Sequence, residues 1–520
     1  MPLPSVEISG SVLQQSILAS VEVIQELNQH WWCMIVCRQT EDQRLDAEDL
    51  LGQTVKVQTT DEDGTSHVHF SGFFYDVKME YEIWGSYKAQ LTAVSDSYKL
   101  DVTARKQYYA EQTLSSIAGT IGGRDGIPVS INAGGSKALN YVQYGETDFS
   151  FLNRIVDDYG AWSRPNESGL EVYDSFQSGA SLNWREEGGL VEFSLQGALA
   201  PASFGGSHYD HHLMQSQTFD KVSKPPQFFD GGQRLTGAVL TASQNLPSGF
   251  EPQRARATTL DTYNDQLMAE SERSIGGAVI GRGCSRNQNL MAGNTVTISG
   301  VLDAKGTYGL VRVEHHWTPQ GYANNFLCTP WMQYRNRRAP AARVWSGIVP
   351  ARVVDHDDPK KMGRIKVRFF WQEIDGSTHW ARTTSPHAGP GRGFMFMPEV
   401  GDEVAVAFED GDPERPVIIG ALWNGVHEQP RDAFFGGEIP NNDIKRLLTK
   451  SGNRIQFIDK PGKESVVVAT PNKLRIAMLE NTDEHGRSTI LVHSEDGDIC
   501  LSAPNGQVHI RSKFFTKETN

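Results

Sequence analysis

The sequence predicts a mainly β protein with α+β insertions, whose last part is an intertwined, trimeric β-helical needle. Three observations predict this fold class. Short runs of alternating apolar and polar residues recur along most of the 520 residues. Clusters of Gly, Pro, Asn and Asp separate these runs, as turns do. The last part of the chain repeats a strand unit too small to bury a core alone, so copies must wind around one another.

The first element expected is a β-barrel over about residues 1–105. Residues 55–59 read VKVQT and residues 67–77 read HVHFSGFFYDV, and both alternate in the manner of strands. Between them, DEDG at 61–64 is typical of a hairpin turn. We therefore expect a β-barrel or a sheet in this part of the chain.

An α+β insertion over about 106–189 and a second β-rich domain over about 190–335 are expected next. A helix is expected at 147–159, because Phe149, Leu152, Ile155, Val156 and Tyr159 fall on one face and Thr147 can cap it. A second helix is expected at 263–275. Val296 and Ile298 then alternate with threonines in a predicted strand. The basic, Ala- and Pro-containing stretch RNRRAPAA at 335–342 reads as a linker.

Residues 343–425 predict a small closed barrel of the oligonucleotide/oligosaccharide-binding type, which we call the collar barrel. Five short strands alternate here, separated by Gly and Pro turns. The turn and core positions singled out are Gly363, Ile365, Val367, Gly401, Val404, Val406, Asp412, Pro413, Pro416 and Gly420.

A linker over 426–446 and a β-helical needle over 447–520 follow. Each repeat offers only one or two inward positions, so a narrow triangular core shared by three chains is expected. The predicted needle core consists of Ile455, Phe457, Ile490, Val492, Ile499, Leu501, Val508 and Ile510. Ile499 should face the threefold axis, whereas Asp498 should face solvent.

Charge and composition argue against several classes of function. The chain has 49 basic and 63 acidic side chains, and the formal charge of −14 disfavours nucleic acid as a partner. The first residues, MPLPSVEISG, do not read as a signal peptide, and no segment is long and apolar enough to cross a bilayer. Synthesis in the cytoplasm is expected. The five cysteines are sparse and odd in number, so buried thiols are expected.

Possible metal sites are weak, and we expect no metal or cofactor. HYDHH at 208–212 offers imidazoles, but adjacent strand residues face opposite ways and do not easily share one ion. His67 and His69 share a strand face without a third ligand. DEDG at 61–64 lacks the closing Glu of a calcium loop, so a turn is favoured.

The candidate catalytic residues of the sequence fit turns and strands better than an active site, which favours a protein that is not an enzyme. Neither the HEXXH nor the G-x-S-x-G motif occurs. Two acidic stretches, 355–358 and 409–414, could hold paired carboxylates for glycan cleavage, but both suit turns. GPGRG at 389–393 reads as a tight turn. Arg364, Lys366 and Arg368 could track a nucleic-acid backbone, although pairing with acids on a neighbouring subunit is preferred.

Several segments resemble the VgrG spike proteins of type VI secretion and of extracellular contractile injection particles, which are similar to the fused hub and needle of contractile phages. The strongest are GRIKVRFFWQ at 363–372, HWARTTSPHAG at 379–389 and FMPEVGDEVAVAFEDGDPERPVIIGALWNG at 396–425. Weaker support comes from residues 141–162, 290–300 and 308–317. LLTKSGNRIQFIDKPGKE at 447–464 resembles the start of that family's needle.

The resemblance implies a structural homotrimer with a hub-like region over residues 1–340. This region would hold two tube-like barrels per chain, at about 1–105 and 190–335, which form a pseudo-sixfold ring in the trimer. Its implied partners are an Hcp-like tube protein, baseplate proteins, a PAAR-type conical tip, effector cargo and, transiently, a target membrane. It implies that the spike punctures that membrane without catalysis. Two alternatives stay open: a cell-wall glycan hydrolase that acts during penetration, and a glycan- or nucleic-acid-binding barrel protein.

Overall fold

A computed structural model describes residues 3–40, 45–81, 86–134, 138–184, 189–211, 213–224, 227–251, 260–333, 347–372, 378–430, 443–471, 474–480, 486–513 and 516. These residues form two compact units, Met1–Leu422 and Trp423–Asn520, each described here by itself. The linker predicted at 335–342 lies outside the described residues, and so does most of the linker predicted at 426–446.

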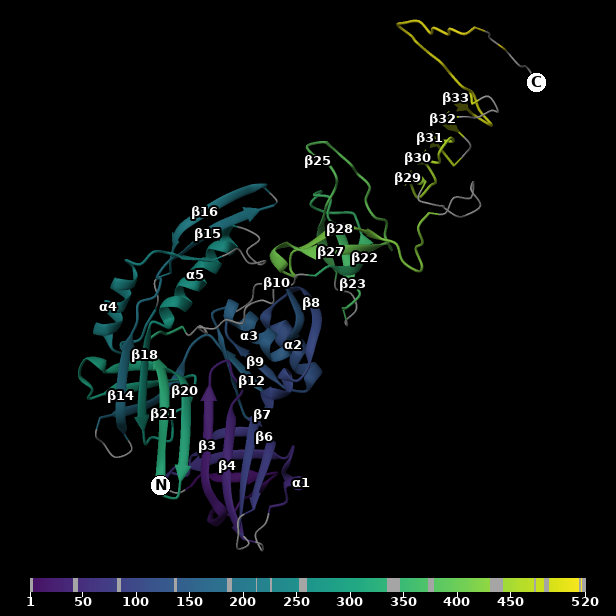
Figure 1. Ribbon diagram of the computed structural model, residues 1–520. Coiled ribbons are helices and arrows are strands. Elements are labelled where there is room, and N and C mark those ends of the chain that lie inside the picture. Colours follow the sequence, from purple (N-terminus) through teal and green to yellow (C-terminus); the bar gives the residue numbers. More distant parts are fainter. Residues whose placement is uncertain are drawn as a thin grey trace. The chain divides into compact units, whose positions relative to one another are not determined.

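One large sheet of 13 strands dominates the first unit (Figure 1). Its path runs β14-β18-β21-β20-β3-β4-β7-β6-β5-β1-β2, and β13 and β19 pair beside it. The strands are β1 (Ser5–Ile8), β2 (Ser11–Val12), β3 (Leu18–Glu26), β4 (Trp32–Thr40), β5 (Thr54–Thr60), β6 (Ser66–Tyr81), β7 (Ser86–Ser95), β13 (Gln177–Asn183), β14 (Leu190–Gly197), β18 (Val279–Ser285), β19 (Asn294–Ser299), β20 (Gly306–Thr318) and β21 (Gly321–Thr329).

The sheet joins both halves of the hub-like region, because β20 pairs antiparallel with β3. Each half nevertheless has its own apolar core. One core gathers around Val21, Ile35 and Phe74, and the other around Val296, Leu310 and Phe326. The short helix α1 (Ala47–Leu50) lies beside the first half. The division of this region into two barrels therefore remains a prediction, with two cores in one continuous sheet.

The insertion between the two halves is an α+β subdomain with its own core. It contains β8 (Ala104–Gln112), α2 (Leu114–Asp125), β9 (Val129–Asn132), β10 (Leu139–Thr147), α3 (Asp148–Asp158), β11 (Trp162–Pro165) and β12 (Leu170–Tyr173). The predicted helix at 147–159 is confirmed as α3. Thr147 caps it by accepting a hydrogen bond from the Ser150 amide, and Phe149, Leu152, Ile155 and Val156 are buried.

Two helices and three short strands form a further group within the later half of the hub-like region. They are β15 (Phe204–Asp210), β16 (Gln215–Val222), α4 (Gln233–Ser243), β17 (Gly249–Phe250) and α5 (Leu260–Gly276). The helix predicted at 263–275 is confirmed as α5. It packs against the β15/β16 hairpin through Tyr263 and Leu267, both fully buried.

The predicted closed collar barrel is confirmed. Its order is β22-β23-β24-β28-β27, and β24 and β28 close it in parallel. The strands are β22 (Val349–Asp355), β23 (Ile365–Phe369), β24 (His379–Thr383), β27 (Glu403–Phe408) and β28 (Pro416–Leu422), and a hairpin of β25 (Ala388–Gly389) and β26 (Arg392–Gly393) extends from it. It forms because alternate residues such as Ile365, Val367 and Phe369 are all buried in one core.

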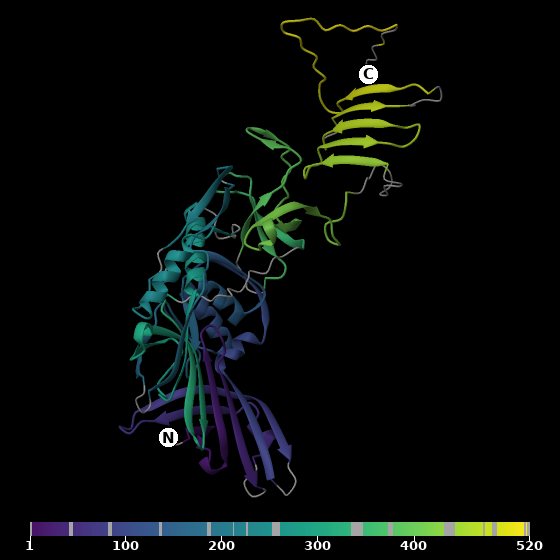
Figure 2. The same cartoon turned by 60° about the vertical axis from the view of Figure 1, so that its left-hand side comes forward.

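The second unit contains a meander of five antiparallel strands, seen side by side in Figure 2. They are β29 (Ile444–Leu448), β30 (Arg454–Ile458), β31 (Ser465–Ala469), β32 (Arg475–Leu479) and β33 (Thr489–His493). Among the described residues, no strand is present around Ile499 or Val508, where strands were predicted. Among the described residues, no helix has both the length and the apolar character needed to cross a membrane.

Candidate functional site: the collar barrel and the needle face

The collar positions singled out from the sequence lie in the barrel core and in its turns. Ile365, Val367, Val404 and Val406 are fully buried, and Pro416 is buried as well. Gly363 and Gly401 have φ angles of 71° and 104°, which only glycine adopts without strain. Asp412 accepts a hydrogen bond from the Glu414 amide across Pro413, and Gly420 is exposed on β28.

The acidic stretch at 355–358 is a loop organised by Asp358. This buried carboxylate accepts backbone hydrogen bonds from Lys360, Met362 and Arg364 at 3.0, 2.8 and 3.3 Å. The Arg364 guanidinium lies 2.6 Å away and holds the pKa of Asp358 well below its usual range. The prediction that Arg364 pairs with an acid on a neighbouring subunit is therefore wrong, because Arg364 pairs with Asp358 of the same chain.

The second acidic stretch, at 409–414, is also a turn. Glu409 pairs with Arg382 and Arg415, and Asp412 closes the turn before β28. GPGRG at 389–393 is the tight turn that the sequence predicts, since Gly389 pairs with Arg392 across it. Carboxylates held in this way stabilise the turns through hydrogen bonds and ion pairs, and they are not arranged as a free acid and base.

The histidines singled out from the sequence lie in separate local environments. His208 is buried and stacks on Tyr263 at 5.6 Å, whereas His212 lies outside the described residues. His67 pairs with Asp61 at 2.8 Å, and His69 bonds to the Thr59 hydroxyl at 2.7 Å. The part of the chain that the structure describes brings together no group of three or more metal-binding side chains.

The DEDG stretch at 61–64 forms the predicted turn. Gly64 has a φ angle of 88°, and its amide donates to the Asp61 carbonyl at 3.0 Å. Asp63 accepts from the Thr65 amide at 2.9 Å, which lowers the pKa of this carboxyl. Burial lowers the pKa of the nearby His69 to about 4, so this imidazole is neutral at pH 7.

One face of the needle sheet consists almost wholly of large apolar side chains. We call it the needle face; its members are Leu447, Ile455, Phe457, Val466, Val468, Ile476, Met478, Ile490 and Val492. The register makes it continuous, because Val466 lies opposite Met478 and Met478 lies opposite Ile490. Four of the predicted needle core residues, Ile455, Phe457, Ile490 and Val492, belong to it.

The needle face is exposed in the single chain. Its side chains are between 37% and 74% exposed, with Val466 at the lower and Ile490 at the upper limit. The remaining predicted core residues, Ile499, Leu501, Val508 and Ile510, are exposed as well, beyond β33. A contiguous apolar surface of this kind on a soluble protein usually marks a site of association.

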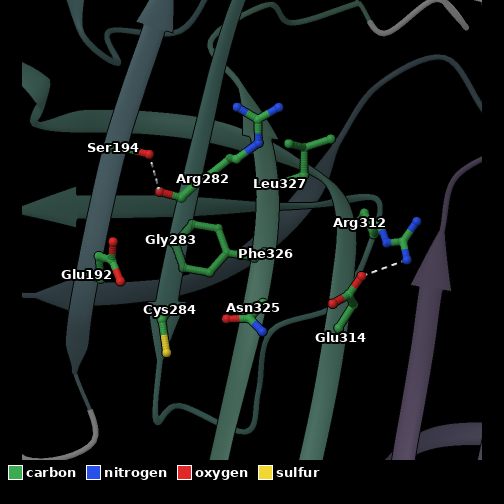
Figure 3. Close-up of a pocket in the computed structure, with 10 residues that line it drawn as sticks. All are labelled: Glu192, Ser194, Arg282, Gly283, Cys284, Arg312, Glu314, Asn325, Phe326 and Leu327. Carbon is green, nitrogen blue, oxygen red and sulfur yellow. Dashed lines mark hydrogen bonds and ion pairs between the residues drawn. The ribbon is translucent and has the colours of Figure 1, made fainter.

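A concavity of about 490 Å³ lies on the hub sheet, where β14, β18, β21 and β20 run side by side (Figure 3). Glu192, Arg282, Arg312 and Glu314 line it, and Arg312 pairs with Glu314 at 2.6 Å. This concavity could not be predicted from the sequence, because its residues come from four separate strands. Its lining residues also include Ser194 and one thiol, Cys284, whose pKa is raised by burial and by the nearby Glu192.

A second feature missed from the sequence is the contact between the insertion and the collar barrel. Tyr108 of β8 stacks on His379 of β24, and Tyr144 of β10 packs edge-on against Trp371. The only sequence signal is the aromatic pair at 108–109, whose partners lie far away along the chain.

Comparison with known protein families agrees with this architecture. A family model described as the phage tail baseplate hub matches residues 26–321, more than half of the chain. The chain belongs to the phage tail baseplate hub family. Within this hub chain, residues 349–423 match a further model, described as the type VI secretion system/phage-baseplate injector OB domain, which coincides with the collar barrel.

Relatives of this hub chain include several spike proteins. It is 32% identical to the type VI secretion system spike protein VgrG4b of Pseudomonas aeruginosa, over 63% of this chain and 45% of the relative. It is 34% identical to VgrG1a of the same organism, over 63% and 55%. It is 24% identical to a Vibrio cholerae protein named actin cross-linking toxin VgrG1, over 72% and 37%. The hub chain thus spans between 37% and 55% of the length of these relatives.

Solved structures share the fold of this hub chain. An Escherichia coli component of the type VI secretion system, described as structurally similar to the phage tail proteins gp27 and gp5, matches with a TM-score of 0.53 at 18% identity, over 80% of this chain and 99% of the other. A Francisella PdpA-VgrG complex matches with a TM-score of 0.61 at 9% identity, over 94% and 78%. The predicted resemblance to VgrG-type spike proteins is confirmed.

Proposed function

We propose that three copies of this hub chain assemble into the spike of a contractile injection system. The single observation that carries the proposal is the exposed needle face. Three copies that turn this face inward would bury it in one narrow seam, as a β-prism requires. Full burial of an exposed large apolar side chain contributes roughly 1.5–3 kcal/mol. The nine needle-face side chains are already partly buried, so each would gain a part of this on association.

The strand arrangement also supports a trimer. Within the described part of this sheet, β29 and β33 are the edge strands, and each pairs with one neighbouring strand. Neighbouring copies would cover these edges and the apolar seam together. A needle built in this way is stiff, because its backbone is hydrogen-bonded along its length.

The hub-like region is proposed to cap the inner tube of the machine. Each chain contributes two β-rich halves with separate cores, so a trimer would present six related units. Such a ring adapts threefold to sixfold symmetry, and an Hcp-like tube protein and baseplate proteins are its proposed partners. This step rests on the family membership of the chain.

Membrane puncture and effector delivery are proposed on the basis of the spike relatives. A narrow needle concentrates the force of sheath contraction on a small patch of target membrane. A PAAR-type tip protein is the proposed companion of the needle, and effectors are its proposed cargo. We propose that the chain performs this role mechanically, since the two acidic stretches are occupied by turn contacts.

Two neighbouring positions on β33 test the trimer. Ile490 lies on the needle face and Thr489 on the opposite face, and both are exposed in the single chain. Ile490→Asp should bring three carboxylates into an apolar seam, which costs several kcal/mol. Light scattering should then show monomers, whereas Thr489→Asp should remain trimeric. Equal behaviour of the two variants would exclude the needle face as the trimer seam.

A further inference from the structure

His379 lies at the point where the insertion meets the collar barrel. It begins β24 and is 4% exposed. The Tyr108 ring stacks on its imidazole with ring centres 3.3 Å apart and planes at 27°. Phe369 packs edge-on against the imidazole at 5.3 Å and 71°. The imidazole is thus sandwiched between a ring of the insertion and a ring of the barrel core.

Two further contacts join the same elements. Tyr144 of β10 meets Trp371 of the barrel at 5.1 Å and 87°. The Val142 amide of β10 donates a hydrogen bond to the Glu414 carboxylate of the barrel at 3.3 Å. This amide therefore reports directly on whether the insertion and the barrel are in contact. We call the contacts of Tyr108, Val142 and Tyr144 with the barrel the latch.

The latch accommodates the neutral imidazole and not the charged one. Nε2 of His379 is buried without a hydrogen-bond partner, and burial lowers the pKa of His379 to about 3. Among the described residues, the charged groups around the latch include Lys106, which lies 4.7 Å over the Tyr144 ring, and Arg154, which donates to the Val142 carbonyl at 2.8 Å. Glu111 and Glu414 act on Tyr108. Burial, together with Glu414 and Glu111, raises the pKa of Tyr108, so its hydroxyl stays protonated.

Two opposing effects act on a protonated His379. Aromatic rings attract a cation through their electron-rich faces. Removing an uncompensated charge from water costs more free energy than this attraction returns, even after relaxation. The desolvation penalty therefore exceeds the attraction to Tyr108 and Phe369.

We propose that the latch is an acid-sensitive conformational device, in which protonation of His379 releases the insertion from the collar barrel. Release exposes the imidazole to water, where it carries its charge at little cost. The proposal concerns contacts within one chain and does not depend on the trimer or on the spike function.

The sign of the pH dependence follows from the two states. The imidazole has an ordinary pKa of about 6.5 when released and about 3 when latched. The latch is therefore fully stable above pH 6.5 and weakens as the pH falls below that value. Each pH unit below it changes the equilibrium about tenfold, so the latch should be roughly 30-fold weaker at pH 5.0.

Hydrogen exchange of the Val142 amide in the full-length chain tests the proposal. Exchange is measured at pH 7.5 and pH 5.0 and corrected for the intrinsic pH dependence of amide exchange. The protection of this amide should fall roughly 30-fold at pH 5.0 in the natural chain. His379→Phe keeps an aromatic ring without a titratable group, so its protection should not change. His356→Gln alters an exposed histidine and should behave as the natural chain.

A second variant keeps the proposal testable if His379→Phe does not fold. Tyr108→Ala removes the stacking ring, so Val142 should exchange rapidly even at pH 7.5 while amides of β23 and β27 stay protected. Unchanged protection of the natural chain at pH 5.0, or an equal loss in His379→Phe, would overturn the proposal. A simultaneous loss in β23 and β27 at pH 5.0 would also overturn it, because the barrel itself would then be unfolding.

Discussion

Asp358 illustrates at the residue scale how an acidic side chain supports a loop. Three backbone amides and the Arg364 guanidinium surround its carboxylate, and its side chain is only 3% exposed. Arg364 also lies over the Trp380 ring at 5.4 Å. Removing one partner from such a buried pair leaves the other uncompensated, which is strongly destabilising.

We predict that Asp358→Ala lowers the free energy of unfolding of the collar barrel by about 3 kcal/mol at pH 7. Because the pKa of Asp358 is lowered in the folded state, its contribution is present above pH 4 and is lost as the pH falls below that value. Urea unfolding followed by Trp fluorescence at pH 7 and pH 3 measures both effects.

Asp357→Ala is the matched control for this prediction. Asp357 is exposed and adjacent in the chain, so its removal should change stability by less than about 0.5 kcal/mol. If both variants unfold alike, Asp358 does not organise the loop.

Local alternation allowed the barrel core to be predicted, but not the partners of its polar residues. Ile365 and Val367 were expected inside because they alternate with basic residues, and the structure buries both. Arg364 was assigned to a neighbouring subunit, since nothing in the sequence indicates that the loop at 355–358 folds back onto it. The contact between Tyr108 and His379 spans still more of the chain and leaves no local pattern.

At the scale of elements, helices with clear apolar periodicity could be predicted, whereas glycine-containing helices could not. The helix α3 has a Thr cap and four buried apolar residues on one face. In contrast, α2 contains Gly122 and Gly123, which disfavour a helix. The structure explains Gly122, because a Cβ there would lie 2.7 Å from the Ile127 carbonyl oxygen. Close packing thus outweighs helix propensity in α2.

We predict that Thr147→Ala lowers the free energy of unfolding of the first unit by about 1 kcal/mol. Its hydroxyl accepts from the Ser150 amide at 3.2 Å and donates to Asp101, and alanine removes both bonds. Thr147→Ser retains the hydroxyl and should restore most of the loss in urea unfolding. A serine variant as unstable as the alanine variant would contradict the capping role.

In the needle repeats, the same sequence pattern accompanies strands in one part of the single chain but not in another. Strands expected around Ile455, Val466 and Ile490 are present, because each has a neighbour in the meander. The segments around Ile499 and Val508 have the same alternation but form no strand. Their pairing with strands of other copies stays a prediction.

At the scale of the whole molecule, the two compact units predict separable behaviour. We predict that a chain ending at Pro430 remains folded but loses the ability to form trimers, because the needle face is absent. Light scattering and thermal melting measure the two properties. A truncated chain that still forms trimers would place the main interface in the first unit, and one that does not fold would contradict the division into units.

The long-range organisation of the hub sheet could not be read from the sequence. Strand β3 pairs with β20, nearly 300 residues later, and this pairing joins the two halves. Turn signals and alternation are local, so they predict that strands exist without predicting which distant strands are neighbours.

The meander of the needle has a consequence for how needles can change in length. In the described residues, β30, β31 and β32 each pair with the strand before and the strand after, and β29 and β33 each pair with one neighbour. Such nearest-neighbour arrays gain stability step by step, like a zipper, and their contacts are close in sequence. Adding or removing one hairpin preserves the direction of the chain and the alternation of every other strand. Needle length can therefore vary by whole hairpins without any change at the base.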